Sequence, residues 1–439
     1  MKHAVPRMLP ALFVKLYSVR AALILAISVC FPRCPLAGQT VNQPITLVQA
    51  VSETLEHNLS LLAERYNIPV AEARIVTARL RPNPVLSLGG DHLDVLGTGY
   101  NSINAAGPSE YSLRTDFLIE RGSKRNSRIA VAENTKSMVE LLLLNTARSL
   151  VLDVQSAFVE ALMAKANLEL AQENLQSLTT VVGLNDRRVK LGDLAEVELV
   201  RLQLAELQFE NTVRQAELRV TTSRAKLHNL LGRARSQPRP DASGDLRRDA
   251  PGMVLETLQS QARENRPDAQ AIVRDRARSR AEILLQLANG KIDYTVGSEF
   301  RRQQGLAGTG NSLGIFFQTN LPVFNRNQGE IERARIEQRQ IEARMRALEA
   351  AIDNEVEIAY LQYVNAQTNL DKIEKTMLVK ARDVRKITQY SYTRGEATLI
   401  EFLDGQKAYN DTIQTYNESR AEYARSLYQI DAATGKATR

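Results

Sequence analysis

Two stretches of the chain read alike and decide its fold. Residues 189–206 read VKLGDLAEVELVRLQLAE, and residues 392–409 read YTRGEATLIEFLDGQKAY. In each stretch a glycine, Gly192 or Gly395, separates two segments of helical composition, and a pair of carboxylates follows within about three turns. Gly395 lies 203 residues after Gly192, which indicates that the chain repeats one arrangement twice.

The same offset recurs at other positions. Gly435 follows Gly232, and Leu321 follows Leu118, by 203 residues. Three landmarks at one offset indicate a tandem duplication. Between the copies, residues 233–252 begin with a proline- and serine-rich segment without helical period, which predicts a linker. We therefore expect a signal peptide at 1–38, a first repeat at 39–232, the linker at 233–252, a second repeat at 253–436 and a C-terminal tail at 437–439.

The N-terminus carries the predicted signal peptide. Basic residues precede an apolar run at 21–29 that is too short to span a bilayer, and small residues at 37–38 offer a cleavage point. Both cysteines, Cys30 and Cys34, lie in this leader, so we expect the mature chain to be exported, cysteine-free and without a lipid anchor. No later apolar run reaches about eighteen residues, so membrane contact must come from strands or from an interface.

The charge balance and the missing motifs exclude several function classes. The chain has 57 Lys and Arg against 50 Asp and Glu, and the two signs are interleaved. This pattern suits helices with many salt bridges, and no nucleic-acid partner is expected. Beyond the leader only three scattered histidines and no cysteine remain, so neither a metal site nor a cofactor is expected. No nucleophile elbow, phosphate loop or metalloprotease motif indicates an enzyme.

Each copy predicts a helix, two strands, a very long helix and a shorter helix. The long helix at 124–190 would measure about 100 Å, and its flanking helices a little over half of that. Helices of this length cannot be buried in a globule and must form a tube or an extended coiled coil. The expected helices are 46–80, 124–190, 193–231, 253–288, 328–392 and 396–432, and the expected strands are 85–93, 111–117, 292–296 and 313–318.

The expected strands alternate between apolar and polar residues. Along 111–117, the tyrosine, leucine and phenylalanine face one way, and the serine, arginine and aspartate face the other. Such alternation is typical of a barrel wall with one wet and one apolar side. Four strands are too few to enclose a channel and leave exposed edges, which favours a ring of subunits that share one barrel. The residues expected to line its lumen are Arg114, Asp116, Asp293 and Glu299.

Four stretches carry a resemblance to a known family. They read RPNPVLS at 81–87, RGSKR at 121–125, LAEVEL at 194–199 and LPVFNRNQG at 321–329. With them the chain resembles the TolC family of outer-membrane efflux proteins, the outer membrane factors. Within that family it is similar to the branch that serves heavy-metal exporters of the cobalt–zinc–cadmium type. One departure is Ser123, where this branch usually has glycine.

The resemblance implies an architecture and partners. The fold would be mainly α with a small membrane β-barrel part: four strands from each of three chains would complete a twelve-stranded barrel in the outer membrane of a Gram-negative type of cell. A long α-helical barrel would extend from it into the periplasm. The implied partners are a homotrimer, a periplasmic adaptor (membrane fusion protein), an inner-membrane pump of the RND type and outer-membrane lipid. The chain would conduct metal cations or small toxic compounds passively.

The resemblance also implies a gate at the periplasmic tips. Gly192 and Gly395 would form the tip turns. Glu401 and Asp404 match the carboxylate pair of the pore constriction. In a trimer, six such carboxylates would crowd together, bind cations and have raised, coupled pKa values.

A latch is implied beside this constriction. Tyr392 matches the family's gate tyrosine, and Glu198 matches a carboxylate that ties neighbouring helices together. Ala397 replaces an arginine of the same latch, so the closed state would depend on fewer bonds or on Arg394.

Other interpretations stay open from the sequence alone. Glu401 and Asp404 are alternatively solvated charges on a helix face. An exit duct of a type I protein-secretion or drug-efflux system would have the same architecture. A periplasmic helical-hairpin adaptor or scaffold would have long hairpins but no lipid-facing strands. A paired-carboxylate hydrolase would need an aromatic cleft, which the sequence around these residues does not offer.

Overall fold

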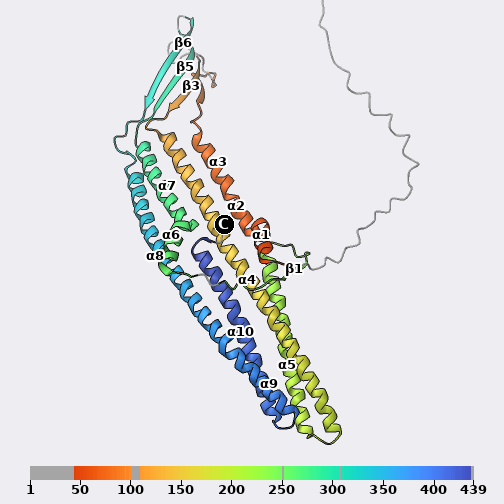
Figure 1. The fold of residues 1–439 in the computed structure, drawn as a ribbon. Helices are drawn as coiled ribbons and strands as arrows, with labels where there is room; N and C mark the ends of the chain where they lie inside the picture. Colours follow the sequence, from red (N-terminus) through yellow and green to blue (C-terminus); the bar gives the residue numbers. More distant parts are fainter. Residues whose placement is uncertain are drawn as a thin grey trace, which may run out of the picture. The chain divides into compact units, whose positions relative to one another are not determined.

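The computed structural model describes residues 44–93, 95–97, 99, 109–249, 252–305 and 308–436. The predicted signal peptide and the predicted C-terminal tail lie outside these residues. Pro44–Arg439 forms one compact unit that contains both copies of the repeat. Within this unit the helices lie side by side, and a small sheet continues from one end of them (Figure 1).

The longest helix has the predicted bounds. Helix α4, Lys124–Lys190, has 67 residues without interruption, and α5, Glu196–Leu230, runs back along it. The equivalent helix of the second copy, predicted at 328–392, is helical throughout Gln328–Thr393, but it contains a π-helical turn that was not predicted. It is divided into α8 (Gln328–Lys372), a π-helical turn η1 (Ile373–Met377) and α9 (Leu378–Thr393). The returning helix α10 spans Leu399–Ala433.

The first predicted helix, 46–80, is broken into three. These are α1 (Leu47–His57), α2 (Leu59–Arg65) and α3 (Asn67–Arg79). Asn58 causes the first break, because its backbone is extended (ψ 121°) and its side chain accepts hydrogen bonds from the first amides of α2. An asparagine competes for backbone amides in this way, and it therefore favours a helix cap over a helix interior.

The predicted helix at 253–288 is broken as well. Helix α6 spans Leu255–Asn265 and α7 spans Pro267–Asn289. Proline at the first position of α7 lacks the amide that α6 would need to continue, and it holds the preceding Arg266 in an extended conformation (ψ 128°).

Four antiparallel strands form one sheet in the order β2–β3–β5–β6. The strands are β2 (Val85–Asp91), β3 (Glu110–Ile119), β5 (Tyr294–Gly305) and β6 (Gly308–Thr319). The central pairing, β3 with β5, joins the two copies of the repeat. The strands of the second copy are longer than predicted, because alternation at their glycine- and glutamine-containing ends is weak.

The residues between the copies pack onto the helices. Strand β4, Asp241–Ala242, pairs in parallel with β1, Pro44–Ile45. Leu246 packs against the buried cluster of Val159, Ala421, Ala424 and Tyr428, which joins α4 to α10. The segment is therefore held on the helices although it has no long element of its own.

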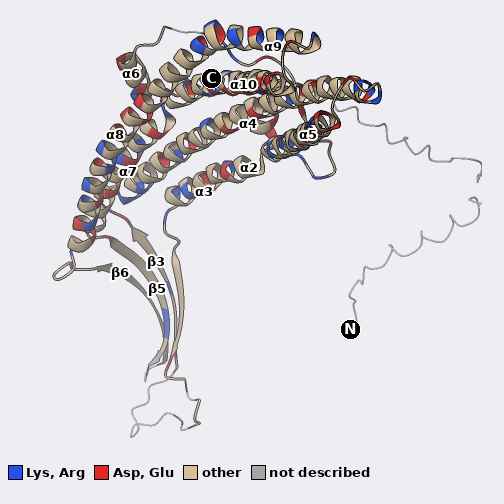
Figure 2. Ribbon diagram, turned by 90° about the horizontal axis from the view of Figure 1, so that it is seen from below, with Lys and Arg blue, Asp and Glu red and all other residues tan. Residues whose placement is uncertain are grey.

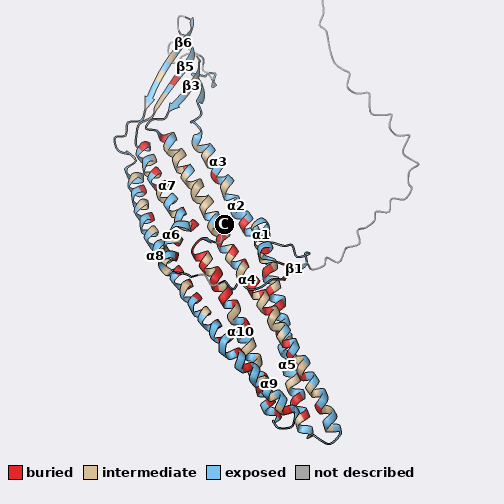
Figure 3. Cartoon of the chain, viewed as in Figure 1, coloured by how far each residue is buried: buried red, intermediate tan, exposed pale blue. Residues whose placement is uncertain are grey.

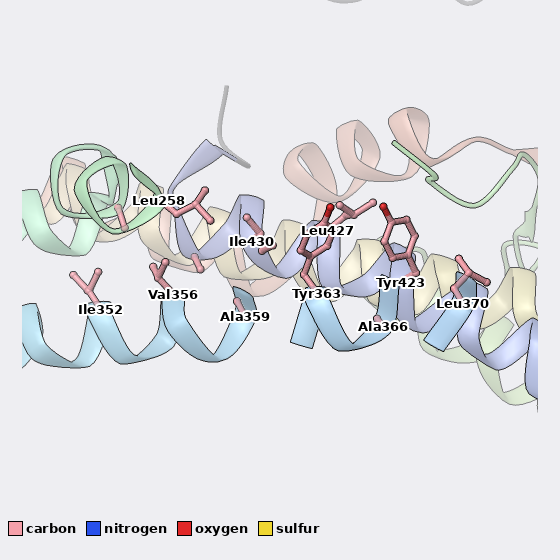
Figure 4. Packing of buried hydrophobic residues seen from close by; sticks show 12 residues of the cluster. Leu258, Ile352, Val356, Ala359, Tyr363, Ala366, Leu370, Tyr423, Leu427 and Ile430 are labelled. Atoms are coloured by element: carbon pink, nitrogen blue, oxygen red, sulfur yellow. The ribbon is translucent and has the colours of Figure 1, made fainter. Parts of the chain in front are cut away.

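The core follows the lines along which helices meet (Figure 3). Its largest cluster joins α6, α8 and α10 (Figure 4). On α8 the buried positions alternate in spacing between four and three residues, which keeps one stripe of a long helix against its neighbours. These positions are Ile352, Val356, Ala359, Tyr363, Ala366 and Leu370.

Charges of both signs are interleaved along the helices, whereas the strands carry few (Figure 2). Among the described residues, none of the helices combines the length and the hydropathy that crossing a bilayer requires.

Candidate functional site

The two predicted tip turns have the same geometry. Gly192 (φ 82°) and Gly395 (φ 76°) each come directly after the end of a long helix, and each has a left-handed backbone conformation. At the first turn, Gly192 N donates to Val189 O and Asp193 N donates to Arg188 O, at 3.0 and 2.9 Å. The second turn has the same pair of bonds. This is a Schellman cap, and its positive φ is what requires glycine. Lack of space is not the reason, since a Cβ at either position would meet no atom within 4 Å.

A hydrophobic cluster joins the two tips. It contains Leu178 of α4, Leu202 of α5, and three residues of the second tip, of which Tyr392 and Phe402 stack with ring centroids 4.9 Å apart. The third is Leu399. The α4–α5 tip and the α9–α10 tip are therefore packed together within one chain.

The hydroxyl of Tyr392 donates to Oδ1 of Asn185, at 3.3 Å. Burial raises the pKa of Tyr392, and Glu198 raises it further, whereas the Asn185 bond and Arg188 lower it. Glu198 is thus near enough to act on the tyrosine electrostatically, but the hydrogen bond goes to Asn185. Asn185 was not predicted as a site residue, although it is a polar residue seven positions after the buried Leu178 on one helix face.

The carboxylate of Glu401 is held by its own helix. Its Oε2 accepts from the backbone N of Thr398, at 2.7 Å, and from the hydroxyl, at 3.0 Å. The Glu401 amide donates in return to the hydroxyl, which completes a capping box. These bonds to Thr398 lower the pKa of Glu401 within the single chain.

Asp404 lies one turn further along α10, exposed, at the edge of a groove of about 350 Å³ between α4, α5 and α10. The groove is also lined by Phe209 and Lys407. Glu401 and Asp404 therefore share a face of α10 and both reach solvent, but their local environments differ.

Buried amides continue the contact between α4 and α10 away from the tips. Gln406 donates to Asn174 at 3.1 Å, and Asn417 donates to Asn167 at 2.8 Å. Hydrogen-bonded polar pairs inside an apolar helix contact fix its register.

The polar face of the sheet carries paired charges. Arg114 Nε donates to both carboxylate oxygens of Asp116, at 3.0 and 2.9 Å, and Arg301 binds Glu299 at 2.9 Å. Gly297 makes room for Asp116, because a Cβ there would lie 2.1 Å from the carboxylate. Three of the four predicted lumen residues are thus gathered on one face.

Asp293, the fourth, lies immediately before β5. It accepts from the buried Lys124 Nζ at 2.6 Å and from Arg121 N at 2.8 Å. The structure gives it a connecting role, because it ties the start of β5 to the start of α4.

The opposite face of the sheet is apolar and exposed. Register pairs its residues across the strands, for example Leu113 with Phe300 and Phe300 with Leu313. Ile315 at the edge is 82% exposed. Such a surface, uncovered by any described element, needs an apolar partner. Its large members are Leu86, Leu88, Tyr111, Leu113, Phe117, Ile119, Val296, Phe300, Leu313, Ile315 and Phe317.

Within the described part of the chain, no three His, Cys, Asp or Glu side chains gather as metal ligands would. The candidate site is therefore a pair of packed helix tips with acidic side chains in solvent, together with a two-faced sheet.

Comparison with known proteins identifies what this arrangement belongs to. The model of the family described as "Outer membrane efflux protein" matches residues 50–233 and 258–436, one stretch in each copy. The chain belongs to this family. Membership confirms the predicted family and function, an outer-membrane efflux channel with its helical part in the periplasm. The alternative interpretation of the chain as a periplasmic helical-hairpin adaptor or scaffold predicts no such sheet and does not fit the structure.

One relative is the cobalt-zinc-cadmium resistance protein CzcC of Cupriavidus metallidurans. It is 24% identical over 378 residues, which cover 85% of this chain and 86% of CzcC. Among solved structures, CusC has a TM-score of 0.72 at 16% identity and covers 89% of this chain and 92% of its own. The Campylobacter jejuni outer membrane channel CmeC has a TM-score of 0.71 at 14% identity, and the match covers 89% of this chain and 86% of the CmeC chain. These two likenesses confirm the fold, which is mainly helical with a few strands.

Proposed function

We propose that three copies of this efflux protein form one periplasm-spanning exit duct. The observation that carries the proposal is the sheet. Among the strands the structure describes, β2 and β6 each pair on one side only, and one face is apolar and exposed. In a bilayer, unpaired strand edges are costly, so edges of neighbouring copies must pair. Three sheets of four strands would close a twelve-stranded barrel with its charged face inward.

Exposed stripes on the helices support a ring of copies. On α5 they include Val197, Val200 and Leu204, and on α9 they include Val384 and Ile387. Within one chain, the first-copy tip packs against the second-copy tip. In a closed ring of three chains, the first and second repeats would alternate around the ring. This order would place α9 of each chain beside α5 of the next chain and cover both exposed stripes.

The tips would act as the gate. Glu401 and Asp404 would project six carboxylates into the constriction, which favours cations and raises the pKa values of crowded carboxyl groups. The buried Tyr392, bonded to Asn185 and influenced by Glu198, supports a latch between the two tips of one chain. The polar residues Arg114, Asp116 and Glu299 would face the lumen of the barrel.

The cargo we propose is metal cations, because the relative CzcC is named for resistance to cobalt, zinc and cadmium. A passive duct needs energy from elsewhere, so the proposal includes an inner-membrane pump of the RND type and a periplasmic adaptor that contacts the tips. Metal selectivity would belong to the pump, since the described residues hold no ligand cluster. The competing proposals are that the duct exports drugs, or that it exports proteins in a type I secretion system.

Planar-bilayer conductance of the purified protein tests the duct and the gate. We expect small, cation-preferring openings that multivalent cations block, and loss of that block in the double variant Glu401→Ala/Asp404→Ala. A matched control is Glu418→Ala, an exposed carboxylate about four turns further along α10. An equal block in all three proteins would show that the constriction lies elsewhere. Absence of insertion and conductance would overturn the duct itself.

A further inference from the structure

The residues between the two copies make a defined set of contacts with the second copy. We call residues 245–249 the strap. Arg247 lies over the ring of Tyr428 at 5.3 Å and pairs with Asp249 and Asp431. The hydroxyl of Tyr423 donates to the carbonyl of Asp249 at 2.8 Å. One end of the strap is thereby fixed to α10.

The next side chain of the strap, Arg248, contacts the helix formed by α8, η1 and α9 instead of α10. Arg248 binds Oε2 of Glu374 at 2.6 Å, and the hydroxyl of Tyr416 donates to Oε1 of the same carboxylate at 3.1 Å. Glu374 thus connects the strap, α10 and the α8–α9 helix at one point.

Glu374 lies in the π-helical turn η1. Its closing bond runs from Leu378 N to Ile373 O, five residues back. At the equivalent place in the first copy, 203 residues earlier, α4 is continuous α-helix. A π turn inside a long helix is uncommon and changes the helix direction there, and such turns are frequent at functional positions.

We propose that the strap is a clamp that sets the bend at η1 and thereby the position of the α9–α10 tip. The proposal rests on the proposed function, in which that tip is part of a gate. Gly395 lies about 20 residues beyond η1, or roughly 30 Å along the helix. A change of about 10° at η1 therefore moves the tip by about 5 Å. Release of Glu374 from Arg248 frees the turn, and the second-copy tip moves while the first-copy tip stays with the uninterrupted α4.

The clamp is weak enough to be reversible. The Arg248 side chain is 64% exposed and that of Glu374 is 21% exposed. Ion pairs this exposed contribute modestly, so we expect loss of the pair to shift the closed–open equilibrium only about two- to fivefold.

Distances between spin labels at the two tips test the clamp without requiring conduction. With Cys30 and Cys34 replaced by serine, labels are attached at Asp193→Cys and Glu396→Cys, both exposed tip positions. Arg248→Gln and Glu374→Gln are expected to broaden the label–label distance distribution and lengthen it by several ångströms. The charge swap Arg248→Glu/Glu374→Arg is expected to restore it. The control is Lys375→Gln in the same turn, because Lys375 pairs only along its own helix, with Asp371, among the bonds described.

The outcomes separate the two proposals. If Arg248→Gln matches Lys375→Gln, or if the charge swap fails to restore the distances, the clamp is overturned, whatever the channel does. If the distances shift as expected and the protein conducts, the open fraction should rise two- to fivefold with them. If the distances shift in a protein that never conducts, the clamp stands and the proposed duct fails.

Discussion

The C-termini of α5 and α10 end alike, 203 residues apart, and each docks on a break between two shorter helices. Gly232 (φ 69°) follows α5 and lies against the carbonyl of His57. Gly435 (φ 77°) follows α10 and lies against the Asn265–Arg266 peptide. Both sites need glycine for the left-handed backbone and for the close approach. The two copies thus share one backbone solution.

The side chains that receive the two helix ends differ. At the first site the amide of Asn58 donates to Leu230 O at 2.9 Å. At the second site Arg266 Nη1 donates to Ala433 O, the carbonyl at the equivalent position, at 3.4 Å. A neutral donor and a cation therefore cap equivalent helix ends, and the cation also favours the negative end of the helix dipole.

The cations of the second site are the more deeply buried ones, since the ion pair at the first site, Arg233 with Glu53, has side chains 21% and 27% exposed. Arg266, with a side chain 4% exposed, binds Asp268 and Glu355, both at 2.7 Å. Arg148 is buried beside it and donates to Ala432 O at 2.6 Å. Burial, together with the nearby Arg266, lowers the pKa of Arg148. Burial opposes ionisation of Asp268 too, but the Arg266 guanidinium outweighs it and lowers the pKa of that carboxyl. Duplicated backbones thus allow very different side-chain energetics.

The largest expected loss of stability comes from replacing the two side chains that receive the helix ends, Arg266 and Asn58. Arg266→Ala removes the nearly buried cation that binds the half-buried Asp268 and also caps α10, and we expect a loss of about 3 kcal/mol of unfolding free energy. Asn58→Ala removes a cap and one neutral hydrogen bond, and should cost about 1–2 kcal/mol. Urea unfolding of the detergent-solubilised protein, followed by circular dichroism, measures both. Equal losses would show that the cationic cap is no more critical than the neutral one.

A second effect concerns space at the glycines. A Cβ on Gly232 would lie 2.3 Å from His57 O, whereas one on Gly435 would lie 3.0 Å from its nearest atom and one on Gly192 would meet nothing within 4 Å. All three have positive φ, which costs alanine about 1 kcal/mol or more. We expect Gly232→Ala to cost about 3 kcal/mol, Gly435→Ala about 2, and Gly192→Ala about 1.

Thermal unfolding of the three variants side by side checks this order. Gly192→Ala is the control, because it carries the backbone penalty alone. If it destabilises as much as Gly232→Ala, close packing at the docking sites contributes nothing, and the backbone conformation explains all of the requirement for glycine.

Much of this architecture was predictable from the sequence, because the duplication repeats its landmarks. The glycine pairs gave the tip turns and the bounds of α4, and alternation gave the two-faced sheet. The breaks at Asn58 and at Pro267 were missed, although both residues carry a local signal, because the apolar stripe continues across them. The π turn η1 has neither glycine nor proline and arises where tertiary contacts meet, so no local signal announces it.

The site was predictable only in part for a related reason. Glu401 and Tyr392 lie close to the turn at Gly395, but their hydrogen-bond partners, Thr398 and Asn185, depend on a cap and on packing between distant helices. Asp293 follows the strand alternation and yet pairs with Lys124, because the strand begins where α4 begins. Residue type and spacing predict which face a side chain occupies, whereas its partner depends on the tertiary register.

The opposite ends of α5 and α10 offer the mildest comparison. Thr398 caps α10, and Glu401 closes the box three residues later. The equivalent positions on α5 are Ala195 and Glu198: Ala195 has a similar extended backbone (ψ 137°), but it has no hydroxyl to accept from the helix. Glu198 is therefore an unused partner for a capping box, and the first-copy tip lacks a stabilisation that the second has.

Ala195→Thr should therefore stabilise the start of α5 by about 0.5–1 kcal/mol, and Thr398→Ala should destabilise the start of α10 by about 1 kcal/mol. Hydrogen exchange in the first turn of each helix measures both, and Ala195→Val is the control of similar shape without a hydroxyl. The folded-state pKa of Glu401 is lowered by its bonds to Thr398, so its contribution is present above the unfolded pKa and is lost as pH falls through the folded value. Thr398→Ala removes the hydroxyl bond, so the pKa of Glu401, followed by NMR of the side-chain carboxyl, should rise above its value in the unsubstituted protein. A pKa that does not change in this variant would show that the hydroxyl contributes nothing to holding the carboxylate, and that the alanine at position 195 does not explain the difference between the starts of α5 and α10.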